Sequence, residues 1–235
     1  MKVAVLGANG FIGHETVLKY REFGHSVCCI SKENYDQNKG QEFDLFINAA
    51  GNKRAFWANQ YPNEDFKIAT SVVYQSLFDF PSNKYVFISS IAVYDEPSHY
   101  GFNKKLSEQI VQRYASVPII MRPCNIVDST INIGLLADIK NNTPLFVTLN
   151  SKMQFITRKD FVRVMMCLVD MNVECCINVG GIGSVTIEEL QDLVGKKAII
   201  KDTAKYRNYE MDVSELSQIT KIKSSRNYVL DTLEV

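Results

Sequence analysis

The sequence offers little that would point to metal binding, disulfide bonding or membrane insertion. Its six cysteines show no C-x-x-C spacing and lie mostly in apolar runs, which is typical of reduced thiols in a cytosolic protein. The three histidines form no ligand cluster, so no metal site is expected. No apolar stretch approaches the ~18 residues of a membrane span, and the first residues enter a predicted strand directly. We therefore expect a cytoplasmic protein with no signal peptide and no contact with a membrane.

An excess of charge of either sign is also absent. Lys+Arg and Asp+Glu both number 26, so the net charge gives no indication of a nucleic acid or an acidic surface as partner. The length of 235 residues, with 46% hydrophobic and 22% charged residues, is enough for a substantial buried core. No internal repeat, low-complexity tract or linker interrupts the chain. Local motifs therefore carry the functional information.

A glycine-containing loop joins a predicted strand, Lys2–Leu6, to a predicted helix that ends at Gly24. In a phosphate-binding loop of this kind Gly7 permits the tight turn, Gly10 lets a pyrophosphate approach the backbone, and Gly13 allows close helix packing. The spacing is G-x-x-G-x-x-G rather than G-x-G-x-x-G, and a loop that merely closes a turn is the alternative. Its position between strand and helix favours dinucleotide binding.

The end of the second predicted strand, His25–Ile30, bears on which dinucleotide binds. Dinucleotide folds usually place Asp or Glu there to bond the ribose hydroxyls. This chain has Ser31 and Lys32, a hydroxyl and an ammonium that favour a 2′-phosphate. NADP is therefore the expected cofactor, while Glu33 and Asp36, which follow closely, leave NAD open.

The third predicted strand, Asp44–Asn48, runs into Ala49, Ala50 and Gly51. Small residues at this point would let a cofactor lie against the end of the strand. The strand end is therefore a second candidate contact with the cofactor.

The middle of the chain carries the clearest candidate chemistry. A buried strand, Val86–Ile88, is expected to end at Ser90, and a helix is expected to begin near Tyr100 after a loop containing Pro97. Tyr100 and Lys104 are four residues apart and so share one helix face. Lys104 would stabilise the phenolate and lower the pKa of Tyr100, and Ser90 would hold a substrate oxygen near the phenol. Taken alone, Y-x-x-x-K is also typical of a solvated helix face.

The rest of the chain continues the alternation of strands and helices. A helix is predicted over Pro62–Phe80, with Phe66, Val73 and Leu77 on one face. The later predicted strands are Val117–Met121 and Cys175–Val179, and the later predicted helices are Ile131–Lys140 and Phe161–Val169. A further helix is capped by Thr186 and Glu189, and a last short helix has Asp212 as cap. This alternation predicts an α/β fold, a doubly wound parallel sheet that binds ligands at the carboxyl ends of its strands. The candidate residues follow predicted strands, so we expect them to converge at that edge.

The ordered set of motifs GANGFIG, INAAG, FISSIAVY, YGFNK, MRPCN and INVGG resembles the extended short-chain dehydrogenase/reductases, the nucleotide-sugar epimerase/dehydratase family. The resemblance covers nearly the whole chain, and the set is more specific than any one motif. It implies one Rossmann-type unit over residues 1–235. Residues 1–122 and the strand near 175–180 would form the dinucleotide-binding core, and residues of about 123–174 and 181–235 a reduced substrate-binding region.

The resemblance also implies roles for single residues. Ser90 matches the catalytic Ser/Thr that contacts substrate, Tyr100 the acid/base, and Lys104 the lysine that also bonds the nicotinamide ribose. Asn125 matches an asparagine that contacts substrate. The candidate cofactor site comprises Gly7, Asn9, Gly10, Phe11, Ile12, Gly13, Ser31, Lys32, Asn48, Ala49, Ala50, Gly51, Lys104 and Pro123. A homodimer, formed through the helix carrying Tyr100 and the one before it, is a family expectation.

The chain departs from the family pattern at four points. The interval between Ser90 and Tyr100 is shorter than usual, and Ala69 stands where the helix usually has a structural Asn. Met153 stands where family members carry Arg before the pair that matches Gln154-Phe155, and the chain is short for the family. We therefore expect a trimmed loop over the sugar and a reduced substrate region.

The predicted function is an NAD(P)-dependent oxidoreductase that reduces a keto-sugar, nucleotide-linked, with Tyr100 as acid/base. Dehydration is not expected, because Ile91 and Ala92 follow Ser90 where the family's 4,6-dehydratases have Asp-Glu. Reduction is favoured by the trimmed loop, by Met153 and by Ser31 and Lys32 at the end of the second strand. The alternative is a C4 epimerase with retained NAD. A non-catalytic NAD(P)-binding regulator is a third hypothesis, and the intact Ser/Tyr/Lys set argues against it.

Overall fold

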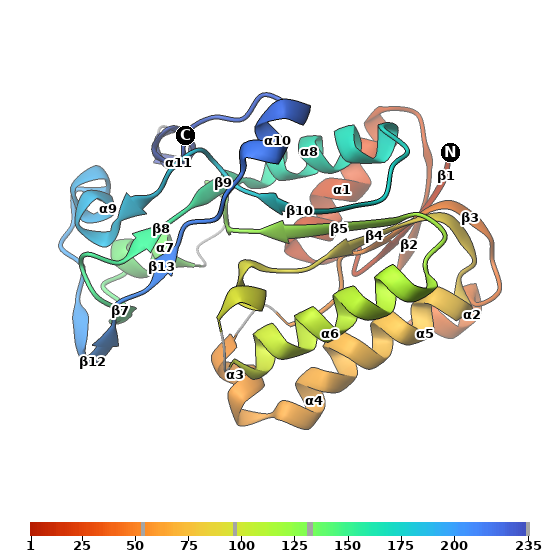
Figure 1. Cartoon of the computed structure of the whole chain (residues 1–235), viewed down its shortest axis with the longest axis horizontal. Helices are drawn as coiled ribbons and strands as arrows, with labels where there is room; N and C mark the ends of the chain where they lie inside the picture. Colours follow the sequence, from red (N-terminus) through yellow and green to blue (C-terminus); the bar gives the residue numbers. More distant parts are fainter. Residues whose placement is uncertain (53–54, 96–97, 131–133, 234–235) are drawn as a thin grey trace. The chain divides into compact units, whose positions relative to one another are not determined.

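Figure 1 shows the computed structural model of the chain, which describes residues 1–52, 55–95, 98–130 and 134–233. The chain divides into two compact units. The first comprises Met1–Arg122 and Val162–Ile177, and the second Pro123–Phe161 and Asn178–Val235. No helix among the described residues is long and apolar enough to cross a membrane.

The first unit is built on a six-stranded sheet in the order β10-β5-β4-β3-β1-β2. Its strands are β1 (Lys2–Leu6), β2 (Ser26–Ile30), β3 (Phe43–Asn48), β4 (Ser82–Ile88), β5 (Pro118–Pro123) and β10 (Cys175–Val179). Strand β1 pairs in parallel with both β2 and β3, so the strand order reverses between β1 and β3. Ligands of doubly wound sheets bind at such a reversal, outside the carboxyl ends of the strands. The predicted α/β fold is confirmed.

Helices cover both faces of this sheet (Figure 1). Helices α1 (Phe11–Glu22) and α8 (Arg158–Asp170) lie on one face, and α5 (Val72–Asp79) and α6 (His99–Tyr114) on the other. Short helices join these elements: α2 (Tyr35–Asn38), α3 (Ala55–Gln60), α4 (Pro62–Phe66) and the 3₁₀ helix η2 (Ile91–Tyr94). The buried core includes Leu6, Ile30, Phe46, Val73, Phe80, Tyr85, Phe87, Val111 and Ile120. Strand side chains thus pack against α5 and α6.

The single helix predicted after the third strand is built from three segments. A π-helical stretch, η1 (Lys67–Ser71), lies between α4 and α5. Asp65 and Ala69 are buried, whereas Phe66, predicted for the buried face, is 41% exposed. The hydroxyl of Ser107 on α6 donates to the Ala69 carbonyl at 2.9 Å. The buried face therefore follows the contact with α6, which local apolar spacing did not indicate.

The second unit consists of short elements. They are β6 (Asn125–Val127), α7 (Leu135–Lys140), β7 (Leu145–Val147), β8 (Lys152–Met153), β9 (Phe155–Thr157), β11 (Val185–Thr186), α9 (Ile187–Val194), β12 (Ile200–Lys205), β13 (Asn208–Tyr209), α10 (Ser214–Ile219) and α11 (Ser225–Leu233). The capping box of Thr186 and Glu189 is confirmed. Asp212 accepts a bond from the Ser214 amide at 2.9 Å ahead of α10, and α11, which follows, was not predicted. The start of the helix predicted at 131–140 and the predicted loop residue Pro97 lie outside the described residues.

Replacing Tyr85 by Phe is expected to destabilise the first unit. Tyr85 is 1% exposed, and its hydroxyl bonds to the Asn48 amide at 2.9 Å and to the Ser76 hydroxyl at 2.7 Å. The change leaves both partners buried without this bond, which lowers the free energy of unfolding by about 1–3 kcal/mol. Urea denaturation measures the loss. The matched control, Tyr74→Phe at a 46% exposed position, should stay within about 0.5 kcal/mol of the parent. Equal stability of the Tyr85→Phe protein and the parent would contradict the prediction.

Candidate active site

The loop between β1 and α1 forms a tight cradle of backbone. Gly7 has φ +81°, a conformation that favours glycine. A Cβ atom at Gly13 would lie 2.1 Å from the Gly7 carbonyl oxygen, and one at Gly7 would lie 2.9 Å from the Ala50 amide nitrogen. The loop and the first turn of α1 contain the other candidates Asn9, Gly10, Phe11 and Ile12. In this described region Gly10 is the N-cap of α1 and no side chain caps the helix, an arrangement that fits a bound phosphate.

Asn48 at the end of β3 shapes the neighbouring turn. Its side chain is 1% exposed, donates to the Tyr85 hydroxyl and accepts from the Ala50 amide at 3.2 Å. Ala49 and Ala50 are partly buried, and Gly51 has φ +133°. Asn48 thus holds the turn through its side chain, while the small residues after it lie beside the glycine loop.

The turn after β2 places the Glu33 carboxylate close to both Ser31 and Lys32. The Ser31 hydroxyl lies close enough to the Glu33 carboxylate to lower its pKa. The Lys32 ammonium lies 3.8 Å from the same carboxylate, and its side chain is 92% exposed. Asn34, which the sequence analysis missed, accepts from the Ser31 amide at 2.8 Å and so fixes the turn. Both candidate phosphate ligands therefore face Glu33.

Ser90 and Tyr100 lie at the starts of η2 and α6, which pack against one another. The Ser90 hydroxyl caps η2 by accepting from the Ala92 amide at 3.1 Å, and Ser98 caps α6 by accepting from the Gly101 amide at 3.3 Å. A Cβ atom at Gly101 would lie 2.0 Å from the Ala92 carbonyl oxygen, so α6 packs directly on η2. In this arrangement the Ser90 hydroxyl acts on the phenol of Tyr100 and lowers its pKa, against the larger effect of burial. The structure thus brings Ser90 and Tyr100 together, and their catalytic roles stay predictions.

Lys104 lies one turn further along α6 and is 3% exposed. Its ammonium donates to the Ile88 carbonyl at the end of β4 at 2.8 Å and lies 4.9 Å from the centroid of the Phe87 ring. The distance from the ammonium to the centroid of the Tyr100 ring is 5.9 Å. The three proposed catalytic side chains thus converge within the first unit, at the carboxyl end of β4.

The pKa values of the pair differ from the sequence-based expectation. Burial raises the pKa of Tyr100 to about 12, against the hydrogen bond from Ser90, and the Asp65 carboxylate raises it further. Burial lowers the pKa of Lys104 to about 8, and Asp65 and Glu108 oppose that shift. The expectation that Lys104 lowers the pKa of Tyr100 is wrong for this structure, because the ammonium bonds to Ile88 and the phenol is desolvated. Tyr100 is therefore a protonated phenol at neutral pH.

An ion-pair network that the sequence analysis missed lies beside this group. Glu108, one turn after Lys104, accepts from the Arg122 guanidinium at 2.8 Å and 2.6 Å and from the Ser89 hydroxyl at 2.5 Å. Arg122 also donates to the Tyr94 hydroxyl at 2.8 Å. The network joins α6 to β4, β5 and η2. Its members lie far apart in the sequence, so no local pattern indicates it.

Pro123 and Asn125, the remaining candidates, lie in the second unit. The Asn125 amide group donates to the Gln154 carbonyl at 3.1 Å. Met153 is 3% exposed and pairs in sheet with Val185, so its side chain belongs to the core of that unit. These contacts give Asn125 a structural partner, and its role toward substrate is a proposal taken up below.

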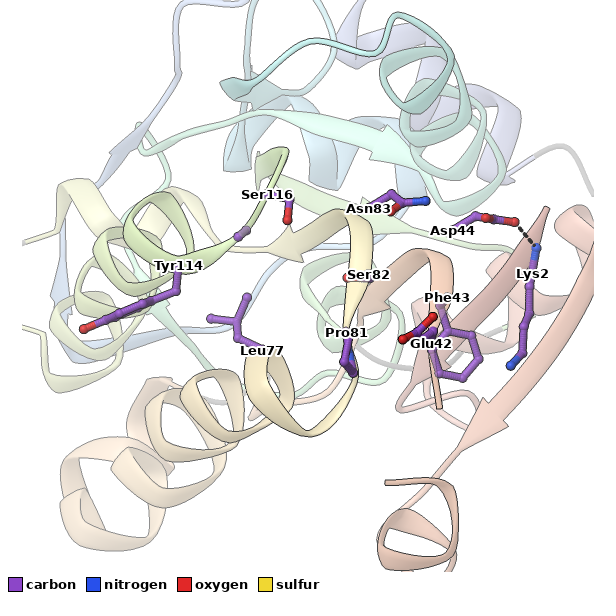
Figure 2. Close-up of a pocket in the computed structure, with 11 residues that line it drawn as sticks. Lys2, Glu42, Phe43, Asp44, Leu77, Pro81, Ser82, Asn83, Tyr114 and Ser116 are labelled. Atoms are coloured by element: carbon purple, nitrogen blue, oxygen red, sulfur yellow. Dashed lines mark hydrogen bonds between the residues drawn. The ribbon is translucent and has the colours of Figure 1, made fainter. Parts of the chain in front are cut away.

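A separate cavity of about 620 Å³ lies at the opposite edge of the sheet (Figure 2). It is lined at the amino ends of the strands by Lys2, Asp44 and Ser82, and by Leu77 and Tyr114 from α5 and the end of α6. Figure 2 shows the Lys2 amide donating to the Asp44 carboxylate, at 2.7 Å. The cavity is remote along the strands from Ser90, so it is not part of the candidate active site.

Comparison with solved structures finds the same fold at low sequence identity. A UDP-galactose 4-epimerase has a TM-score of 0.77 and 19% identity, with 100% of this chain and 98% of that chain covered. A dTDP-4-dehydrorhamnose reductase from Clostridium acetobutylicum has a TM-score of 0.78 and 16% identity, covering 100% and 99%. MoeE5 in complex with UDP-glucose and NAD has a TM-score of 0.80 and 16% identity, covering 100% and 98%.

Among curated protein sequences none matches this chain. The sequence does match the family described as the NAD dependent epimerase/dehydratase family over residues 3–180. That range includes the glycine loop, Ser90, Tyr100 and Lys104. The chain therefore belongs to the NAD-dependent epimerase/dehydratase family.

Proposed function

We propose that this protein reduces the keto group of a sugar, nucleotide-linked at its anomeric carbon, with a nicotinamide cofactor. The observation that carries the proposal is the buried Lys104 ammonium, which lies 5.9 Å from the centroid of the Tyr100 ring and donates to the Ile88 carbonyl two residues before Ser90. A backbone cradle that fits a pyrophosphate lies in the same unit, at the carboxyl ends of the strands. The family supplies the class of cofactor.

The protonated state of Tyr100 suits the reducing direction. When bound by the glycine loop, a reduced nicotinamide would supply hydride to the carbonyl carbon, and negative charge would develop on the substrate oxygen. The Tyr100 hydroxyl gives its proton to that oxygen, and Ser90 holds the oxygen in reach of the phenol. Because burial raises the pKa of Tyr100 to about 12, the group begins turnover with the proton that reduction requires. Tyr100 then regains a proton from solvent.

Lys104 contributes positive charge next to the phenol. The proton leaving Tyr100 creates a phenolate, and a neighbouring ammonium stabilises that anion. Lys104 also matches the family's lysine that bonds the nicotinamide ribose. With a pKa of about 8, Lys104 carries its charge below that pH and loses it as the pH rises through that value.

Elimination of water is not part of the proposed reaction. Ile91 and Ala92, which follow Ser90, form the start of η2 and have hydrocarbon side chains that transfer no proton. The substrate class rests on the structural relatives, whose names include UDP-galactose and dTDP-4-dehydrorhamnose. Asn125 is proposed to contact substrate by its match to the family motif.

C4 epimerisation is the second candidate, because the same fold carries UDP-galactose 4-epimerase activity in a relative. An epimerase returns the hydride to the intermediate and so has to retain its cofactor. The buried Met153, at the position of an anchoring Arg, favours the reductase. A regulator without turnover has no need of the Ser90–Tyr100 contact or of a buried Lys104.

The proposed cofactor preference is NADP, with NAD as the other member of the class. Ser31 and Lys32 would bond a 2′-phosphate, and Glu33 is the group that competes for both of them. A 2′-phosphate would have to displace the Glu33 carboxylate from the Ser31 hydroxyl. Glu33 therefore weakens the NADP preference that Ser31 and Lys32 would otherwise confer.

Replacing Tyr100 by Phe is expected to lower kcat by about 10²–10⁴-fold, because the transferable proton is lost. Cofactor binding should be unchanged, since the ring is kept. Steady-state kinetics and cofactor fluorescence titration measure the two effects. Tyr114→Phe, at the 49% exposed end of α6, is the matched control and should retain parental activity. Near-full activity of the Tyr100→Phe enzyme would exclude Tyr100 as the acid.

The choice between reductase and epimerase is decided by the fate of the cofactor. A reductase should consume one NADPH for each 4-hydroxy sugar nucleotide formed from a nucleotide-linked 4-keto sugar, and the purified protein should carry no stoichiometric cofactor. Absorbance at 340 nm and product analysis by NMR give the ratio. Redox-neutral interconversion of UDP-glucose and UDP-galactose on retained cofactor would instead establish the epimerase.

Replacing Glu33 by Gln is expected to tighten NADPH binding about two- to fivefold, the modest effect of an exposed charge, and to leave NADH binding almost unchanged. The change removes the carboxylate that faces Ser31 and Lys32 and repels the 2′-phosphate. Calorimetric titration with both cofactors measures it. Glu22→Gln, which removes the partner of Lys19 at the far end of α1, is the control and should alter neither affinity. Tighter binding of NADH than NADPH by the parent protein would contradict the NADP preference.

A further inference from the structure

Asp65 on α4 is a carboxylate inside the first unit with no exposed surface. One of its oxygens accepts from the Asn52 amide nitrogen at 3.0 Å, and the other accepts from the Asn103 amide nitrogen at 2.8 Å. Both partners are neutral amides, which satisfy the oxygens without neutralising their charge. A buried anion is costly, so its retention needs a reason.

The two asparagines are neighbours in sequence of residues at the Lys104 site. Asn103 precedes Lys104 on α6 and is 4% exposed. Asn52 follows Gly51, and a Cβ atom at Gly51 would lie 3.6 Å from the Lys104 ammonium nitrogen. Asp65 therefore ties together the turn after β3 and the helix that carries Lys104.

The charge of Asp65 reaches the reacting pair. It raises the pKa of both Lys104 and Tyr100, and its effect on Lys104 is the largest of those that oppose desolvation. The other charge that acts on Lys104 comes from α6. Glu108 is the second carboxylate, and its charge is shared with Arg122 through two hydrogen bonds.

We infer that Asp65, held by Asn52 and Asn103, is a positioning residue that keeps the Lys104 ammonium charged and in place beside Tyr100. This inference rests on the proposed function for its catalytic consequence, but the effect on Lys104 is a property of the protein alone. Ala69, one turn beyond Asp65 on the buried face, has no polar side chain for this role. The polar side chain that acts on Lys104 from this part of the chain is thus Asp65, one turn before Ala69.

The test measures Lys104 directly by NMR in the cofactor-free protein, with ¹³C at lysine Cε and Lys104→Met to assign the signal. The parental signal should titrate near pH 8, apart from exposed lysines near 10.4. Asp65→Asn removes the charge and keeps the size of the side chain. Its Lys104 signal should titrate about one pH unit lower, the shift expected when a nearby opposite charge is lost. An unchanged midpoint in a folded Asp65→Asn protein would overturn the inference.

Asn103→Ser is the control for packing, because it removes one hydrogen bond to Asp65 and keeps the carboxylate. Its Lys104 midpoint should stay close to the parental value, and a fall as large as that of Asp65→Asn would show that packing rather than charge is responsible.

In turnover, Asp65→Asn should lower kcat about fivefold at pH 8, and kcat should recover at pH 6.5, as a one-unit shift of the Lys104 pKa requires. A kcat loss that is equal at both pH values would also count against the inference. If the protein proves not to use a nicotinamide cofactor, the proposed function fails while the NMR result still decides the role of Asp65.

Discussion

The burial of the Lys104 ammonium is the interaction on which the candidate site depends. Removing a charged group from water costs several kcal/mol unless other groups replace the lost hydration. Here the replacement comes from the Ile88 carbonyl, the face of the Phe87 ring and two carboxylates. These groups belong to β4, α6 and α4, so the charge can be held only when all three elements are in place. The position of Lys104 is thus coupled to the packing of α4 and α6 against β4.

The two carboxylates near Lys104, Glu108 and Asp65, have different partners. Glu108 forms a bidentate pair with Arg122 and so links α6 to β5. The guanidinium neutralises much of the negative charge of Glu108. Asp65 is held by amide groups, and its charge acts on Lys104 and Tyr100 together. A negative charge that keeps the lysine protonated also keeps the phenol protonated. The arrangement therefore favours a site whose tyrosine starts as an acid.

Local signals in the sequence predicted most strands of the first unit and a helix cap in the second, and long-range packing accounts for what they missed. The strand at Lys2–Leu6 and the cap at Thr186 depend on neighbouring residues, and both are found as predicted. Phe66 was placed on the buried face because a regular helix was assumed, but a π-helical stretch follows it and Asp65 faces inward instead. In the sequence, Asp65 resembles an ordinary acidic residue in a first helical turn. Its burial depends on Asn103, far along the chain, so no local pattern could reveal it.

The short interval between Ser90 and Tyr100 has a structural consequence for substrate binding. It is spanned by η2, which Ser90 caps, and by Ser98, which caps α6. Both hydroxyls accept amide hydrogens at helix starts, and Val93 in η2 is buried in the core. The buried Met153 supplies no polar contact in the second unit. Fewer fixed contacts mean weaker retention of bound ligands. An enzyme that releases product and spent cofactor in every cycle tolerates that weakness, whereas an epimerase, which has to hold its intermediate while the sugar turns over, does not.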